Sequence, residues 1–264
     1  MLEKQLGPDH PDVAIALHSL AMVYREQGRY AEAVPLFNRS VAISEKWLGP
    51  EDTKVATTLN QLALLHTYQG NYGEAEPLSK RAVAIYEKRL PADHLDLASG
   101  LHTLAMIYAY QGKYGEAEPL FQRSLRIVEN RLGADHPFMA AGLGQLGLLY
   151  TYQGRYNDAE PLLKLANSIN VKQLGPEHPD VAISLQNWAL LYKYQGRYTE
   201  AEPLLHRALL ITENARGVDH PALAIALESY ADVLRKMNRG AEADKMSERA
   251  RQIKSRNAQA NPNN

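Results

Sequence analysis

A period of 42 residues runs through this chain of 264 residues and constrains its fold more than any other feature. A Gln-Gly pair recurs at this spacing without insertion, at Gln27-Gly28, Gln69-Gly70, Gln111-Gly112, Gln153-Gly154 and Gln195-Gly196. The sixth position in register is Asn238, and asparagine tolerates the left-handed backbone conformation best after glycine. Whole columns keep one residue type, such as Leu17, Leu59, Leu101, Leu143, Leu185 and Leu227. This pattern predicts a repeat protein of six stacked units.

Each unit has the pattern of two helices. In the first unit, apolar residues recur at spacings of three and four, the helical period, at Val13, Ala14, Leu17, Leu20, Ala21 and Tyr24. These residues predict a first helix from about Pro11 to Gln27, with Leu17, Leu20, Ala21 and Tyr24 in the core. A second helix is predicted from about Tyr30 to Trp47, and Gly28 and Gly49 follow the two helix ends. Proline fits the first position of a helix, and Asp9 or His10 is expected to cap it.

A proline lies about five residues into most of the second helices, at Pro35, Pro77, Pro119, Pro161 and Pro203. Proline removes a backbone hydrogen bond inside a helix. We therefore expect each of these helices to start slightly later than the pattern suggests, or to bend.

The repeat also predicts the domain organisation. Residues 7–256 form six units, at about 11–47, 53–89, 95–131, 137–173, 179–215 and 221–255. Residues 1–6 match the end of a second helix one period later, so we expect them to be the remnant of a preceding repeat. Residues 257–264 are polar and are expected to form a disordered tail.

Composition excludes several classes of function. The net charge of −1 provides no field to attract nucleic acid or an anionic membrane. The chain has no cysteine, which rules out disulfides, thiolate metal ligands and thiol nucleophiles. It has no apolar run of about 18 residues and no signal-peptide pattern, so we expect a cytoplasmic protein.

No motif predicts catalysis, a metal site or a cofactor. The recurring linker histidines, His10, His94, His136, His178 and His220, are separated by one repeat, up to ~20 Å. Zinc ligands must all lie about 2.0–2.1 Å from one ion, so these histidines are expected to cap helices or pack in linkers. Glu76, Glu118, Glu160 and Glu202 recur with Arg81, Arg123 and Arg207 five residues after three of them. We interpret them as a ladder of surface or inter-repeat ion pairs, and predict that the protein is not an enzyme.

The repeat resembles the tetratricopeptide-repeat (TPR) family. The residues that carry the resemblance in the fifth unit are Leu185, Trp188, Ala189, Tyr192, Gly196, Tyr198 and Ala201. The usual TPR period is 34 residues. The longer period, the Leu-Gly-Pro-Glu/Asp-His-Pro linker and the Ala-Glu-Pro-Leu segment are similar to the TPR domain of kinesin light chains and their bacterial relatives, over about residues 3–255. The resemblance implies an all-α, right-handed superhelix (an α-solenoid) of six antiparallel helix pairs, whose first helices line a concave face.

That face is the candidate binding site. In the kinesin-light-chain subfamily, the resemblance implies asparagines that hydrogen-bond the backbone of a cargo, and here only Asn60 and Asn187 keep that residue type. Tyrosines one repeat apart suit an interface, because they combine apolar area with a polar tip; the alternative is that they pack against the next repeat. The candidate peptide-binding residues are Asn60, Gln61, Leu64, Tyr68, His102, Thr103, Met106, Tyr110, Gln145, Leu148, Tyr152, Gln186, Asn187, Leu190, Lys193 and Tyr194.

The leading hypothesis is a protein–protein interaction scaffold that binds a peptide segment of another protein on this face. One alternative is a regulatory or sensor arm of a larger multidomain protein. Another is a structural array that self-associates through the open N-terminal repeat face. No nucleic acid, membrane or cofactor is expected as a ligand.

Overall fold

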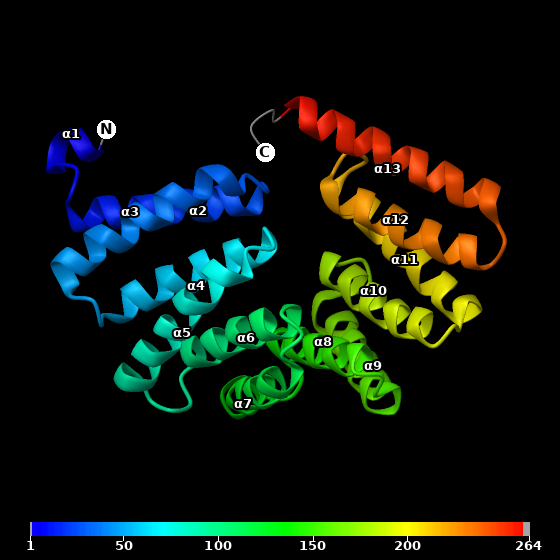
Figure 1. Cartoon of the computed structure of the whole chain (residues 1–264), viewed down its shortest axis with the longest axis horizontal. Coiled ribbons are helices and arrows are strands. Elements are labelled where there is room, and N and C mark those ends of the chain that lie inside the picture. Colours follow the sequence, from blue (N-terminus) through cyan, green and yellow to red (C-terminus); the bar gives the residue numbers. More distant parts are fainter. Residues whose placement is uncertain (1, 261–264) are drawn as a thin grey trace. The chain divides into compact units, whose positions relative to one another are not determined.

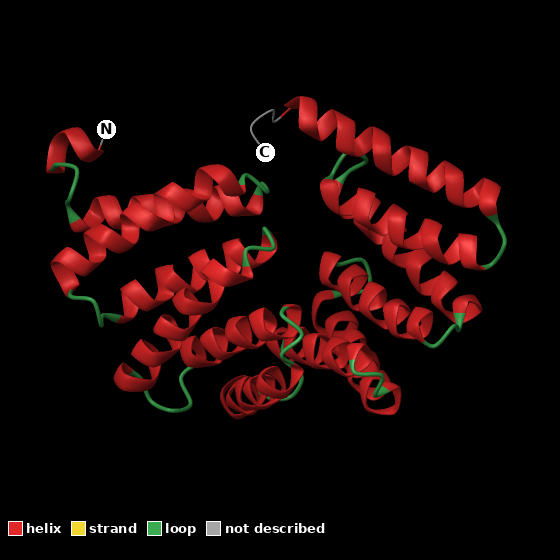
Figure 2. Ribbon diagram, in the orientation of Figure 1, coloured by secondary structure: helices red, strands yellow, loops and turns green. Residues whose placement is uncertain are grey.

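The computed structural model describes residues 2–260, and every regular element in that range is an α-helix (Figures 1 and 2). A short helix α1 (Leu2–Leu6) precedes six helix pairs. The first helices of the pairs are α2 (Pro11–Glu26), α4 (Thr53–Tyr68), α6 (Leu95–Tyr110), α8 (Pro137–Tyr152), α10 (Pro179–Tyr194) and α12 (Pro221–Lys236). The second helices are α3 (Tyr30–Leu48), α5 (Tyr72–Arg89), α7 (Tyr114–Leu132), α9 (Tyr156–Leu174), α11 (Tyr198–Arg216) and α13 (Gly240–Ala260).

The chain forms two compact units that divide between Arg131 and Leu132, at the end of α7. In unit 1, α2 packs on α3, α3 on α4, α4 on α5 and α5 on α6. In unit 2, the same order runs from α8 through α13. First helices of consecutive repeats also touch, α4 with α6 and α8 with α10. Within each unit, the repeats therefore bury their apolar faces against one another, as a stacked repeat requires.

The linker histidines cap the first helices, which is one of the two roles predicted for them. The Nδ1 atoms of His10, His94, His136, His178 and His220 each accept a hydrogen bond from the backbone N–H two residues later. In the second repeat the aspartate Asp52 takes this role. Each cap satisfies one of the backbone donors that a helix leaves free at its first turn.

The turns between paired helices use the left-handed conformation that the repeat predicts. Gly28 has a φ of 74°, and Asn238, at the sixth position in register, has a φ of 60°. A Cβ added at Gly28 would meet no atom within 4 Å, so the constraint there is the backbone angle and not space. Asn238 is the one non-glycine residue with positive φ in the described part of the chain.

The prolines do not delay the second helices, so the expected later start is wrong. The helix α3 begins at Tyr30, although Pro35 is its sixth residue. The first backbone N–H groups of a helix have no partner within it in any case. Pro35 therefore removes a single bond, the one to the carbonyl of Ala31, and the helix continues through it.

Two apolar positions of the first repeat are less buried than predicted. Leu20 is exposed and Tyr24 is half-buried, whereas Leu17 and Ala21 lie in the core. The residue equivalent to Leu20 in the next repeat, Leu62, is buried in a cluster with residues of α3. Among the described residues only the short helix α1 precedes α2, so Leu20 has no comparable helix over it.

The C-terminal helix is longer than predicted. The helix α13 continues to Ala260, so the expectation of a disordered tail from residue 257 onward is wrong for residues 257–260. The side-chain amide of Asn257 donates to the carbonyl of Asp219 at 2.8 Å, which ties this part of the helix to the linker before α12. Residues 261–264 lie outside the described residues.

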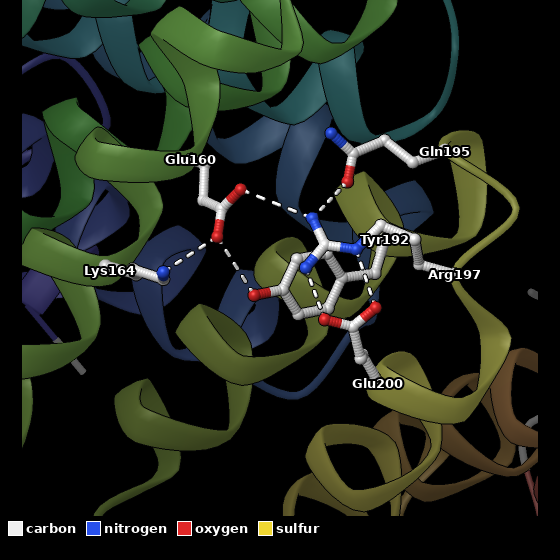
Figure 3. A network of polar contacts seen from close by, with 6 residues as sticks. All are labelled: Glu160, Lys164, Tyr192, Gln195, Arg197 and Glu200. Carbon is white, nitrogen blue, oxygen red and sulfur yellow. Dashed lines mark hydrogen bonds and ion pairs between the residues drawn. The ribbon is translucent and has the colours of Figure 1, made fainter.

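A polar network joins the fourth and fifth repeats (Figure 3). The guanidinium carbon of Arg197 lies 4.1 Å from the centre of the Tyr192 ring, and Arg197 Nη1 reaches Glu160 of α9 at 3.4 Å. Tyr192 also donates its hydroxyl to Glu160 at 3.1 Å. The hydrogen bond from Lys164 and these partners hold the pKa of the Glu160 carboxyl below its usual value. We call this arrangement the inter-repeat latch.

The latch recurs at other junctions with the same residue register. Glu76 is bound by Lys80 and by Lys113 of the next repeat, which lowers its pKa to about 2, and Arg239 contacts Glu202. The predicted ladder of ion pairs is therefore present, but its cation is the residue after the turn. The expected partner five residues after the glutamate is wrong in all three repeats. Arg81 pairs with Glu45 and Arg123 with Glu87, and Arg207 has no ion-pair partner among the described residues.

Removing the latch cation should destabilise unit 2 moderately. We expect Arg197→Ala to lower the free energy of unfolding by about 1 kcal/mol, because it deletes a cation–π contact and two partly exposed ion pairs, to Glu160 and Glu200. The check is urea denaturation, with Arg207→Ala as control, since Arg207 is exposed and has no ion-pair partner among the described residues. Equal midpoints for the two variants would show that the latch contributes nothing.

Candidate functional site

The predicted binding residues lie on first helices of both units. Those of unit 1 are on α4 and α6, and those of unit 2 are on α8 and α10. We describe the two units separately and call the surface that these helices present in each unit the first-helix face.

Three predicted residues of unit 1 do not face solvent. Asn60, Thr103 and Met106 are only 3%, 3% and 7% exposed, so the expectation that they present side chains to a ligand is wrong. Because α4 and α6 touch, the Asn60 amide donates to the hydroxyl of Ser99 at 3.3 Å. Thr103 donates its hydroxyl to the carbonyl of Ser99 at 3.1 Å. The Asn60 amide therefore joins two repeats, whereas Thr103 bonds within α6. Gln61 and Leu64 stay partly exposed.

His102 is held as a neutral ring in the same region. Its imidazole meets Phe121 edge to face, with 5.4 Å between ring centres. Burial lowers the pKa of His102 to about 4, because the charged form loses its hydration. His18, at the same register in the first repeat, contacts Phe37 in the same way. A ligand at this position therefore meets an uncharged ring at neutral pH.

The four tyrosines one repeat apart, which we call the tyrosine ladder, both pack against neighbouring side chains and stay partly exposed for a ligand. Tyr68 and Tyr110 stack on Tyr30 and Tyr72 of the preceding repeats, with ring centres 6.2 and 5.6 Å apart. In unit 2, the rings of Tyr152 and Tyr194 meet at 5.8 Å. The ladder residues Tyr68, Tyr110, Tyr152 and Tyr194 nevertheless remain between 39% and 51% exposed. One side of each ring packs against protein, and about half of its surface stays accessible.

A pocket of about 160 Å³ in unit 2 gathers four of the predicted residues. Its lining consists of Gln186, Asn187, Ala189, Leu190 and Lys193 of α10, Leu205 of α11 and Ser229 of α12. We call it the α10 pocket. Ala189, Leu205 and Ser229 were not predicted as site residues. Ser229 stands at the register of Asn187 in the next repeat, so the repeat itself is the signal that could have located it. Gln145 and Leu148 of α8 are partly exposed and lie outside this lining.

The polar groups of the α10 pocket have unused hydrogen-bonding capacity. The Lys193 ammonium pairs with the Asp232 carboxylate at the edge of the pocket. The side-chain amides of Gln186 and Asn187 make no hydrogen bond to any other described residue. Gly144 of α8 leaves space beside the Asn187 amide, because a Cβ there would lie 3.4 Å from Asn187 Nδ2. Two amides beside the apolar Leu190 can each donate and accept.

Within the described residues, no group of three or more acidic or histidine side chains could hold a metal ion. No described helix is long and apolar enough to cross a membrane.

Comparison with known proteins identifies the family. A family model described as tetratricopeptide repeat matches residues 1–46, 12–88, 96–169 and 180–256, which is most of the chain. The chain belongs to the tetratricopeptide-repeat family. No curated protein matches it significantly.

The similar solved structures include TPR arrays of the kinesin-light-chain type. A crystal structure of nearly identical TPR-like repeats from a putative kinesin light chain of Podospora anserina is 30% identical. The match covers 78% of this chain and 98% of that one, with a TM-score of 0.61. BtubC (BKLC) from P. vanneervenii is 21% identical over 84% of this chain and 89% of that one, with a TM-score of 0.66.

A third TPR fold is that of a Rap protein complexed with Competence and Sporulation Factor. It is 15% identical over 92% of this chain and 75% of that one, with a TM-score of 0.66. The predicted family and the predicted all-α TPR fold class are both confirmed.

Proposed function

We propose that this TPR array is a non-enzymatic scaffold that binds an extended segment of a partner protein along its first-helix face. The observation that carries the proposal is the α10 pocket, where two amides without internal partners flank an apolar surface. An extended polypeptide offers one N–H and one C=O per residue. Gln186 and Asn187 can bind such groups in pairs, and Leu190 offers an apolar contact for a side chain.

The fold supports this proposal in general terms. The similar Rap protein was solved in complex with Competence and Sporulation Factor, so a fold of this kind accommodates a partner. In unit 2, the half-exposed Tyr152 and Tyr194 add accessible surface on the first helices, with rigid rings that lose little entropy on binding. The Lys193–Asp232 pair leaves the pocket close to neutral, so we expect a segment of mixed character.

The test begins with ligands selected from a random peptide library against the whole chain, followed by calorimetric affinities for defined variants. For the selected peptides, Asn187→Ala is expected to weaken binding by about tenfold, because it removes hydrogen bonds to a desolvated backbone. Asn157→Ala is the matched control, since Asn157 is exposed on α9 outside the pocket.

Peptides that bind both variants and the parent with equal affinity would refute the role of the α10 pocket. Failure to select any peptide would refute the scaffold function at this face. Light scattering on the free chain also tests the alternative of self-association, which predicts a mass above that of the monomer.

A further inference from the structure

A second pocket, of about 180 Å³, lies in unit 1 between the first two repeats, where no site was predicted. It is lined by Ala14, Ile15 and His18 of α2, Ser40 and Ser44 of α3, and Lys54, Thr57 and Thr58 of α4. Ile15 is exposed at the pocket, whereas Ala14 and Ser40 are buried. We call this pocket the first slot.

One repeat later, the protein fills the same slot with its own side chain. Tyr86 is the residue in register with Ser44, and it is 2% exposed. Its hydroxyl donates to Thr57 at 3.1 Å. Gly100, in register with Thr58, makes room for the ring, since a Cβ there would lie 3.1 Å from Tyr86 Cδ2. The first slot is therefore open because Ser44 lacks a ring.

The charge at the end of the slot is also reversed between the two repeats. In the filled slot one repeat later, Asp96 places a negative charge near the Tyr86 hydroxyl. The first slot has Lys54 at this register. Aspartate also stands at this register in Asp12 and Asp180. Lys54 has no carboxylate partner among the described residues. The other unit 1 lysines with described side chains, namely Lys46, Lys80, Lys88 and Lys113, all form ion pairs.

The hydroxyl groups of the first slot differ in what they can still bind. The hydroxyl of Thr58 already donates to the carbonyl of Lys54 at 3.1 Å, and that of Ser40 donates to the carbonyl of Ala14 at 2.8 Å. The hydroxyl of Ser44 has no hydrogen-bond partner among the described residues. The Thr57 hydroxyl donates to the carbonyl of Thr53 at 3.0 Å, and His18 Nδ1 hydrogen-bonds the Thr58 hydroxyl at 3.1 Å. The Lys54 ammonium and the Ser44 hydroxyl thus remain as donors, beside the apolar wall of Ala14 and Ile15.

We propose that the first slot binds a glutamate side chain of the partner segment, with its methylenes against Ala14 and Ile15 and its carboxylate on Lys54 and Ser44. The identity of the carrier rests on the proposed scaffold function, while the recognition of glutamate by the slot does not. Carboxylates suit this site because a charge-assisted hydrogen bond to an ammonium is stronger than a neutral one.

The experiment is an NMR titration of the whole chain with N-acetyl-glutamate methylamide and, separately, with its glutamine analogue. The glutamate probe should shift the backbone amide signals of Ser44, Lys54, Thr57 and Thr58 to saturation, and the glutamine probe should bind about tenfold more weakly. Lys54→Asp, which copies Asp96, should abolish the preference. Lys236→Asp is the matched control, because Lys236 is also exposed without an ion-pair partner among the described residues.

A second variant fills the slot and leaves Lys54 in place. Ser44→Tyr/Thr58→Gly copies the pair Tyr86 and Gly100, and it should abolish glutamate binding while a thermal melt shows that the chain remains folded. Equal affinity for the two probes, unchanged binding in the filled variant, or no shift at these residues would overturn the proposal. Since the scaffold function is tested with selected peptides and Asn187→Ala in unit 2, failure of one test is distinguishable from failure of the other.

Discussion

Replacing Phe121 by alanine should lower the free energy of unfolding by about 3–5 kcal/mol, the range for truncating a buried aromatic side chain. Phe121 is 1% exposed and supports the ring of His102. The variant loses the apolar contacts of the ring and gains a cavity, which weakens the packing between α6 and α7. The measurement is the midpoint of urea unfolding, followed by circular dichroism.

The chain provides a matched control for this substitution. Phe138 is 60% exposed at the first turn of α8, and Phe138→Ala should change the stability by less than about 0.5 kcal/mol. If Phe121→Ala unfolded at the same urea concentration as Phe138→Ala, this result would contradict the burial of Phe121 between α7 and α6. The comparison distinguishes the effect of removing a buried phenyl ring from the effect of removing an exposed one.

The second large effect is a loss of stability in mild acid caused by His102. Its pKa is about 4 in the folded chain, against about 6.5 for an unperturbed histidine. Between these values the unfolded chain binds more protons, so the stability rises with pH. The contribution of His102 is therefore complete above pH ~6.5 and is lost as the pH falls to ~4. Its upper limit is about 3 kcal/mol, and the partial exposure of the residue reduces it.

The test is His102→Asn, which copies Asn60 at the same register of the preceding repeat. The difference in unfolding free energy between the parent chain and this variant should shrink or reverse between pH 7 and pH 4.5. The exposed His206 gives the control, since His206→Asn should follow the parent at both pH values. If the free energy of unfolding changed with pH in the same way for all three proteins, His102 would take up protons equally in the folded and the unfolded chain. The carboxyl of Glu76 contributes separately, at lower pH, because its pKa is lowered from 4.5 to about 2.

Local features of the fold follow directly from the sequence. The turn at Gly28, the asparagine substitute Asn238 and the capping role of His10 each depend on a few neighbouring residues. They also recur six times, or nearly so, which makes their pattern easy to detect. The pairing of helices then follows, because a single amphipathic pair cannot bury its apolar stripe.

Features that depend on the distance between repeats could not be predicted in the same way. The helical pattern placed Asn60 opposite the core, yet the close approach of α6 buries it against Ser99. Conversely, Leu20 fits the apolar pattern but lacks the neighbouring helix that buries Leu62. The first slot depends on a single small residue, Ser44, at a register where the next repeat has Tyr86. Periodicity within one helix contains no information on such contacts.

Chimeric arrays built from these repeats have a compatibility rule. Each latch needs a glutamate from one repeat and a cation from its successor, as at Glu76 and Lys113 or Glu160 and Arg197. At the junction of the first two repeats, both partners are missing together, since Val34 stands in the glutamate register and Asn71 in the cation register. Neutral and charged junctions are thus two types of connector. An engineered array that reorders the repeats must match connector types, or it leaves a carboxylate without its counter-charge from the next repeat.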